Sequence, residues 1–176
     1  MVSRLARALF GMIWVPLMLL TTTGCDLFFA YHPRDFDLER PLLQSQPLFD
    51  QLIKMADEDP LVARIATDFY KLDTNNGKPI DEPTPRFSKD RWDQYREIFR
   101  ALGLKSGLMR LPEYPGVVFL LPFYNELKLV DDEGYAYSIQ PLAPQKNSLE
   151  HPREIRPGFV FKHVKGNWYL FAIGKP

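Results

Sequence analysis

The sequence predicts an α+β fold in which N-terminal helices pack on one face of an antiparallel β-sheet. Up to Gly103, apolar residues recur with helical spacing; after it they recur in short runs with a period of two, separated by turn residues. Helices followed by consecutive strands that short turns connect are typical of α+β domains. We expect a single domain over residues 43–176, which is long enough to bury a hydrophobic core.

The segment before that domain predicts a signal peptide over residues 1–24. Arg4 and Arg7 precede an uncharged, mostly apolar run over residues 9–20, which is shorter than the ~20 residues that a membrane-spanning helix needs. Pro16 lies inside this run and would weaken a permanent transmembrane helix. These features indicate export across a membrane.

The four residues Thr22-Thr23-Gly24-Cys25 resemble the bacterial lipobox. The resemblance implies that Cys25 receives a diacylglyceryl group and becomes the first residue after cleavage. Thr22 departs from the family pattern, which prefers Leu at that place. Because two acyl chains already anchor a protein stably, we expect the membrane to be a partner through Cys25. A buried structural cysteine and a plain secretory signal are the alternatives.

Asp26 adds to the localisation that this resemblance implies. In enteric-type lipoproteins an aspartate after the cysteine retains the protein on the inner membrane, facing the periplasm; a chance acidic residue is the alternative. We expect residues 25–42 to form a lipidated tether, because Pro33 and Pro41 interrupt it and no periodicity is sustained. The chain has no second cysteine, so in an oxidising periplasm its fold depends on packing alone.

Helical spacing first appears in the domain over residues 48–55. Asp59-Pro60 then offers an N-cap and a first helical residue, which predicts a second helix over residues 59–72. A loop dense in Asn, Gly and Pro follows over residues 73–85.

The best-signalled helix is predicted between Ser88, a favourable N-cap, and Gly103, a favourable residue after a helix. Its apolar face carries Trp92, Tyr95, Phe99 and Leu102.

Strands are predicted over residues 117–121, 126–129, 135–140, 159–164 and 168–173. Residues 131–134 are expected to form a hairpin turn, with Gly134 where a positive φ is wanted. Residues 141–157 are expected to form a Pro-rich loop. The last strand is apolar on both faces, so we expect it to be central or covered on both sides.

A second resemblance covers about the last half of the chain. The runs GYAY, NSLEHP and FVFKHVKGNWYLF, preceded by the helix RWDQYREIFRALGL, are similar to a family of small proteobacterial lipoproteins. These motifs consist of turn and core residues, and the family has no established activity from which a function could be inferred.

No catalytic, metal-binding or cofactor-binding residues are predicted. The three histidines, His32, His151 and His163, lack ligand spacing, and residues 73–77 fit a turn better than a calcium loop. Ser138 and Ser148 belong to no nucleophile motif. Acidic clusters at residues 57–59 and 131–133 fall at the ends of elements, where acids are common. The net charge is zero, with 22 basic and 22 acidic residues, which gives no reason to expect nucleic acid as a partner.

Aromatic residues of neighbouring strands form the remaining candidate for a functional site. Either a two-sided core buries them, or they form an exposed binding face for a protein or envelope ligand; the six are Tyr135, Tyr137, Phe159, Phe161, Trp168 and Tyr169. The leading hypothesis is a lipoprotein that binds a macromolecule without chemistry, as in toxin immunity or envelope assembly. The alternatives are a small-ligand carrier or sensor and, third, a cell-envelope hydrolase.

Overall fold

A computed structural model describes residues 34–73, 78–122, 133–150 and 157–174. Within these ranges the chain forms three helices and a seven-stranded antiparallel sheet, so the predicted α+β class is confirmed. The predictions for Cys25, Asp26 and residues 126–129 lie outside the described residues.

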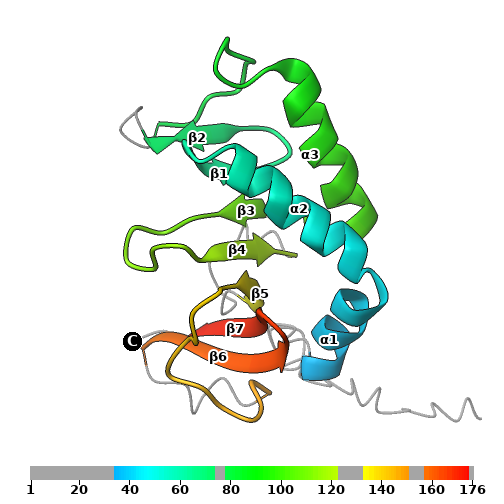
Figure 1. Cartoon of the computed structure of the whole chain (residues 1–176), viewed down its shortest axis with the longest axis vertical. Coiled ribbons are helices and arrows are strands. Elements are labelled where there is room, and N and C mark those ends of the chain that lie inside the picture. Colours follow the sequence, from blue (N-terminus) through cyan, green and yellow to red (C-terminus); the bar gives the residue numbers. More distant parts are fainter. Residues whose placement is uncertain (1–33, 74–77, 123–132, 151–156, 175–176) are drawn as a thin grey trace, which may run out of the picture.

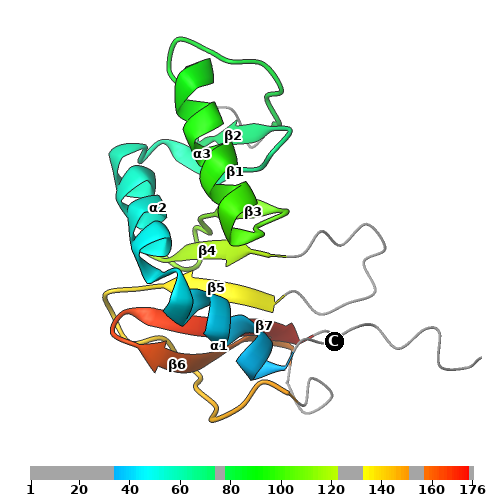
Figure 2. The ribbon, with the colours of Figure 1, turned by 90° about the vertical axis from the view of Figure 1, so that its right-hand side faces the viewer.

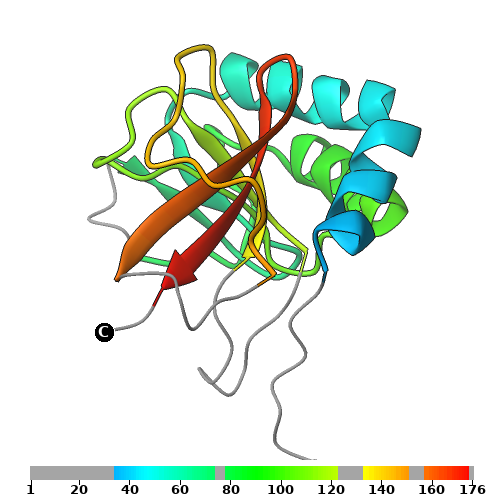
Figure 3. The ribbon, with the colours of Figure 1, turned by 90° about the horizontal axis from the view of Figure 1, so that it is seen from below.

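The helices are α1 (Asp35–Gln44), α2 (Gln46–Glu58) and α3 (Lys89–Leu102). The caps predicted for α3 are present: Ser88 Oγ accepts a hydrogen bond from the Arg91 N–H at 3.2 Å, and Gly103 is left-handed with φ of 69°. The views of Figures 2 and 3 show the three helices gathered on one side of the sheet.

Helix α1 corrects the prediction of a tether over residues 25–42, which is wrong from residue 35 onward. Leu38 and Leu42 are buried one turn apart, and Asp35 is buried beside them. The helix contains Pro41 and has a short apolar stripe, so its sequence gave little periodic signal. The folded domain therefore begins about eight residues earlier than expected.

The seven strands run in the order β2-β1-β3-β4-β5-β7-β6 across the sheet (Figure 1). Their bounds are β1 (Val62–Ile65), β2 (Tyr70–Leu72), β3 (Gly107–Met109), β4 (Val118–Leu121), β5 (Glu133–Tyr137), β6 (Gly158–Lys165) and β7 (Trp168–Gly174). Strand β7 lies between β5 and β6, so the prediction that the last strand is interior is confirmed.

The prediction of a helix over residues 59–72 is wrong, because this segment forms the β1–β2 hairpin between α2 and α3. Pro60 stops α2 immediately after its C-cap, Asp59. β1 then pairs with β3, and its β-branched ends, Val62 and Ile65, are both buried.

Gly134 is a strand residue of β5, not the positive-φ residue of a turn. A Cβ at this position would lie 2.2 Å from the Leu120 carbonyl oxygen of β4 and 2.9 Å from Pro122. Glycine is therefore required by the close approach of two backbones.

Both faces of the sheet are covered. The larger core lies between the helices and one face, with Phe49, Trp92 and Leu170 at its centre. A smaller core lies on the opposite face, around Phe119 and Phe171. Phe119 of β4 and Phe159 of β6 bring their ring centroids to 5.0 Å although β5 and β7 lie between them. Because strands are ~4.8 Å apart, this contact requires a sheet that curls around the smaller core.

Candidate functional site

The six aromatic residues proposed as a binding face do not form one. Tyr135 and Trp168 belong to the core under the helices, with Tyr137 packed against it, whereas Phe161 and Tyr169 belong to the opposite core, with Phe159 packed against that. Four of the six are buried, with 5% exposure or less: Tyr135, Phe161, Trp168 and Tyr169. The exposed-platform interpretation is therefore wrong, because alternate residues of each strand point to opposite faces and both faces are covered.

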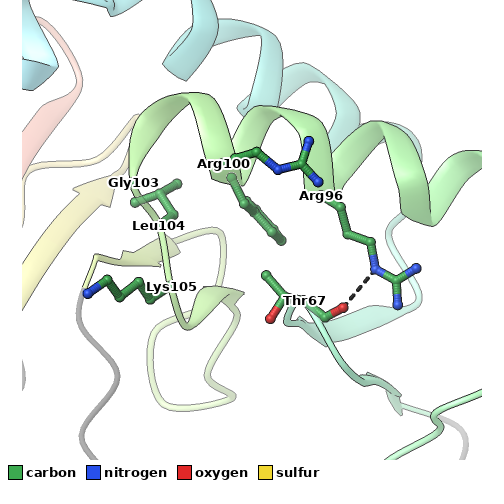
Figure 4. Close-up of a pocket in the computed structure, with 7 residues that line it drawn as sticks. Thr67, Arg96, Arg100, Gly103, Leu104 and Lys105 are labelled. Carbon is green, nitrogen blue, oxygen red and sulfur yellow. Dashed lines mark hydrogen bonds between the residues drawn. The ribbon is translucent and has the colours of Figure 1, made fainter.

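An open groove beside the C-terminal half of α3 is the candidate site. It encloses about 430 Å³, and its lining residues are Thr67, Arg96, Phe99, Arg100, Gly103, Leu104 and Lys105 (Figure 4). Three separate segments contribute: α3, the turn that follows it, and the loop between β1 and β2. Three of the seven lining residues are basic and none is acidic, so the groove favours a negatively charged ligand.

The apolar part of the groove is rigid. Phe99 and Leu104 are each 1% exposed and belong to the core under the helices. Leu104 is fixed by its backbone N–H, which donates to the Phe99 carbonyl at 2.8 Å and closes the end of α3. The groove floor is therefore set by core packing.

Arg96 is held in place by three contacts. Its Nε donates to the Thr67 carbonyl at 2.7 Å, its Nη1 pairs with Asp93 at 3.0 Å, and its guanidinium lies 3.8 Å from the centroid of the Trp92 ring. The dashed bond to Thr67 in Figure 4 joins α3 to the β1–β2 loop across the groove. A fixed guanidinium offers its remaining donors to a carboxylate or phosphate with little loss of conformational entropy.

Arg100 and Lys105 are exposed at the rim. Within the described part of the chain, neither side chain forms a hydrogen bond or an ion pair. Figure 4 shows that Arg100, Arg96 and Lys105 extend in different directions. The three cationic side chains are therefore spread around the groove and do not converge on one point. This arrangement suits an extended, negatively charged peptide segment better than a single small anion. Arg100 also lies in the last turn of α3, where a cation interacts favourably with the helix dipole.

The acidic cluster at residues 57–59 serves the fold. Arg91 Nε binds Asp59 at 2.7 Å and its Nη2 donates to the Met55 carbonyl at 3.0 Å, while Arg110 Nη2 donates to the Ala56 carbonyl at 2.6 Å. The two arginines thus add side-chain donors to carbonyls of the last turn of α2, which otherwise share the Asp59 backbone N–H. Burial lowers the pKa of Arg91, but the hydrogen bonds that its guanidinium donates to Asp59 and Glu58 outweigh burial and raise the pKa overall.

Tyr95 completes this cluster, because its hydroxyl donates to Asp59 at 2.8 Å. Burial, together with that hydrogen bond, raises the pKa of Tyr95 well above its ordinary value. The phenol therefore stays protonated and links α3 to the end of α2.

A second pocket of about 360 Å³ lies between the start of α2 and the β6–β7 turn, and two of the six aromatic residues, Tyr137 and Trp168, line it. Its polar side chains bond one another: Trp168 Nε1 donates to Asp50 at 3.1 Å, and Asn167 Nδ2 donates to the Tyr137 hydroxyl at 3.2 Å. A ligand in this pocket would have to replace these bonds.

Other candidate residues make local contacts. His163 lies 2.9 Å from the Gly166 carbonyl and against the Tyr169 ring, Ser138 Oγ donates to the Gln140 carbonyl, and Ser148 Oγ accepts the Glu150 N–H. Among the residues that the structure describes, no three His, Cys, Asp or Glu side chains gather as a metal site would require. None of the described helices has both the length and the apolar character needed to cross a membrane.

The groove could not be predicted from the sequence. Arg96 and Arg100 lie off the apolar face of the predicted helix, and the sequence does not indicate what lies opposite them. Their i, i+4 spacing, with Lys105 just after the helix end, was the available signal. Comparison with family models, with curated proteins and with solved structures gives no significant match.

Proposed function

We propose that this chain is a lipid-anchored protein of the bacterial envelope whose domain binds an acidic segment of a protein partner and catalyses no reaction. Cys25, in the lipobox-like sequence, carries the anchor, and Asp26 favours the inner membrane with the domain facing the periplasm. The α3 groove is the observation that carries the binding proposal, since it combines three cations with an apolar floor and no acidic lining residue.

The shape and charge of the groove favour a peptide segment over an enclosed small molecule. Its basic rim would pair with carboxylates, and its floor would receive one apolar side chain of the partner. Rim charges mainly set association rate and specificity, so binding should weaken at high salt. An immunity protein that neutralises a toxin and an assembly factor for an envelope complex are two versions of this function.

Crosslinking followed by affinity capture from native membranes tests the proposal. Arg100→Glu reverses a rim charge, whereas Lys54→Glu makes the same change on an exposed position of α2 away from the groove. We expect the chain and its Lys54→Glu variant to capture the same protein, and Arg100→Glu to recover about tenfold less of it, as one lost charge pair of about 1.4 kcal/mol implies. Equal capture by both variants, or no specific protein at all, would refute the binding proposal.

The anchor is tested in the same membranes. Cys25→Ser should leave the precursor uncleaved or release the protein from the membrane, because serine has no thiol to form the thioether. Membrane retention and normal processing of this variant would contradict the anchor.

A small-ligand carrier remains a second candidate because of the pocket beside Trp168. Planar polar side chains next to two aromatic rings suit a polar, ring-shaped ligand such as a saccharide. If the domain is a small-ligand carrier, Arg100→Glu and Lys54→Glu should give the same result in the capture experiment.

A further inference from the structure

Helix α1 has an apolar face that the domain does not cover. Phe36 and Leu43 are 60% and 50% exposed, and Arg40 is exposed between them. Their i, i+4, i+7 spacing aligns the three side chains on one side of the helix, opposite the buried Leu38 and Leu42. We call Phe36, Arg40 and Leu43 the outer stripe of α1.

We propose that the outer stripe of α1 lies in the headgroup region of the bilayer that holds the lipid anchor. This inference rests on the proposed function, because it needs an acylated Cys25. Its occupant is a lipid surface with anionic headgroups, as three features indicate: the short chain before α1, the chemistry of the stripe, and the attachment of α1 to the sheet.

The chain between the anchor and α1 is short. Residues 26–33, eight in all, separate Cys25 from Arg34, the N-cap of α1. A fully extended chain spans at most ~3.6 Å per residue, and ten residue steps lead from Cys25 to Asp35, so the helix starts within about 36 Å of the anchor residue. Tethering at this range gives the stripe a high effective concentration at the bilayer, so even a weak surface interaction is populated.

The stripe has the chemistry of an interfacial helix. Phe and Leu side chains enter the boundary between headgroups and acyl chains, while an Arg side chain extends to the phosphates. Acidic residues at the sides of the stripe have cationic partners: Asp37 pairs with Arg34 at 3.4 Å, and Glu39 pairs with Lys162 at 2.7 Å. These pairs reduce the repulsion between α1 and anionic lipids.

Contact through α1 would orient the whole domain. Asp35 is buried and binds Lys162 of β6 at 2.8 Å, which fixes α1 to the sheet. Figure 1 places α1 toward one end of the long axis, with β2 and the loop before α3 at the other. The contact would then fix the orientation of the domain relative to the bilayer, with β2 at the end of the long axis farther from α1.

Site-specific fluorescence on the full-length lipidated protein in vesicles tests the contact. In the lipidated protein the sulfur of Cys25 is blocked, so Leu43→Cys supplies the single thiol for an environment-sensitive dye. Phe36→Cys is the second labelling site on the stripe. Leu61→Cys and Ile139→Cys are matched controls, because Leu61 and Ile139 are large apolar residues that are 49% and 75% exposed away from α1.

In vesicles of phosphatidylethanolamine and phosphatidylglycerol, we expect the dye at positions 36 and 43 to be quenched by aqueous acrylamide about threefold less than at 61 and 139. Such protection follows from insertion about 5–10 Å into the interface. Equal quenching at all four positions, with the sulfur of Cys25 acylated by mass, would overturn this inference and leave the anchor intact. Protection that grows with the protein-to-lipid ratio would assign the stripe to a second copy and would also overturn it. An unmodified sulfur at Cys25 would refute both the proposed lipid anchor and the membrane contact of the outer stripe.

Discussion

Replacement of Asp35 by alanine should be among the most destabilising single polar substitutions in this domain. The Asp35 side chain is buried, and it accepts the Leu149 backbone N–H at 3.1 Å and the Lys162 ammonium at 2.8 Å. It thereby holds α1 against the loop before β6 and against β6 itself. Burial lowers the pKa of Lys162, but the hydrogen bonds that its ammonium donates to Asp35 and Glu39 raise the pKa overall, so Lys162 stays charged at neutral pH.

The expected cost follows from these two partners. A hydrogen bond to a charged group contributes about 1.5–3 kcal/mol in a partly buried setting. Lys162 keeps Glu39 as a second partner at 2.7 Å, which offsets part of the loss. We therefore expect Asp35→Ala to lower the free energy of unfolding by about 2–4 kcal/mol. Asp35→Asn keeps an acceptor for the Leu149 N–H and should cost less.

Urea unfolding followed by tryptophan fluorescence measures this effect, with Asp37→Ala as the matched control. Both aspartates lie in the first turn of α1, but Asp37 is 33% exposed and pairs only locally with Arg34. Exposed pairs of this kind contribute ~0–1 kcal/mol. If Asp35→Ala and Asp37→Ala shift the midpoint equally, the long-range role assigned to Asp35 is refuted.

Two further predictions concern packing and pH. Gly134→Ala should prevent normal folding or cost more than about 3 kcal/mol, since its Cβ would meet the Leu120 carbonyl at 2.2 Å. Gly103→Ala, with a positive φ but open space around the Cβ, should cost only about 1–2 kcal/mol in the same thermal or urea assay; equal costs would contradict the close-approach argument. Stability should also fall as the pH rises above about 10, where the unfolded chain releases the Tyr95 proton and the folded chain retains it. Urea midpoints between about pH 8 and pH 11 measure this dependence, and Tyr95→Phe should make it shallower, with part of it remaining because burial also raises the pKa of Tyr135; an unchanged slope in that variant would contradict the assignment.

Elements with local signals could be predicted from the sequence. Helix α3 has Ser88 at its start and Gly103 at its end, and both caps act through residues within one turn. The β6–β7 hairpin is likewise marked by two runs of strand-forming residues on either side of a short turn that contains Gly166. In these cases neighbouring residues alone favour the structure that forms.

The segment over residues 59–72 could not be predicted because its structure depends on distant partners. Val62, Ile65, Ala66 and Phe69 have the spacing of a helical face, yet β1 pairs with β3, which comes more than forty residues later. Pairing of this kind overrides a local pattern. The start of the domain was placed too late for a related reason, since Asp35 is held by residues of the other half of the chain.

For the candidate site, alternation correctly indicates that neighbouring residues such as Trp168 and Tyr169 point to opposite faces of the sheet. It does not indicate that both faces are covered, which here results from the curl that brings Phe159 to Phe119. The α3 groove could not be predicted either, because Thr67 lines it from the β1–β2 hairpin, which was predicted as a helix.

The bond between Asp35 and Lys162 joins residues that are 127 positions apart. Of the described elements α1 is synthesised first, whereas β6, to which it is bonded, is the second-last. Helix α1 therefore cannot reach its final place until nearly the whole chain is available, and such distant closures are slow steps in folding. Of the described helices and strands, the first to be synthesised is therefore one of the last to reach its final position.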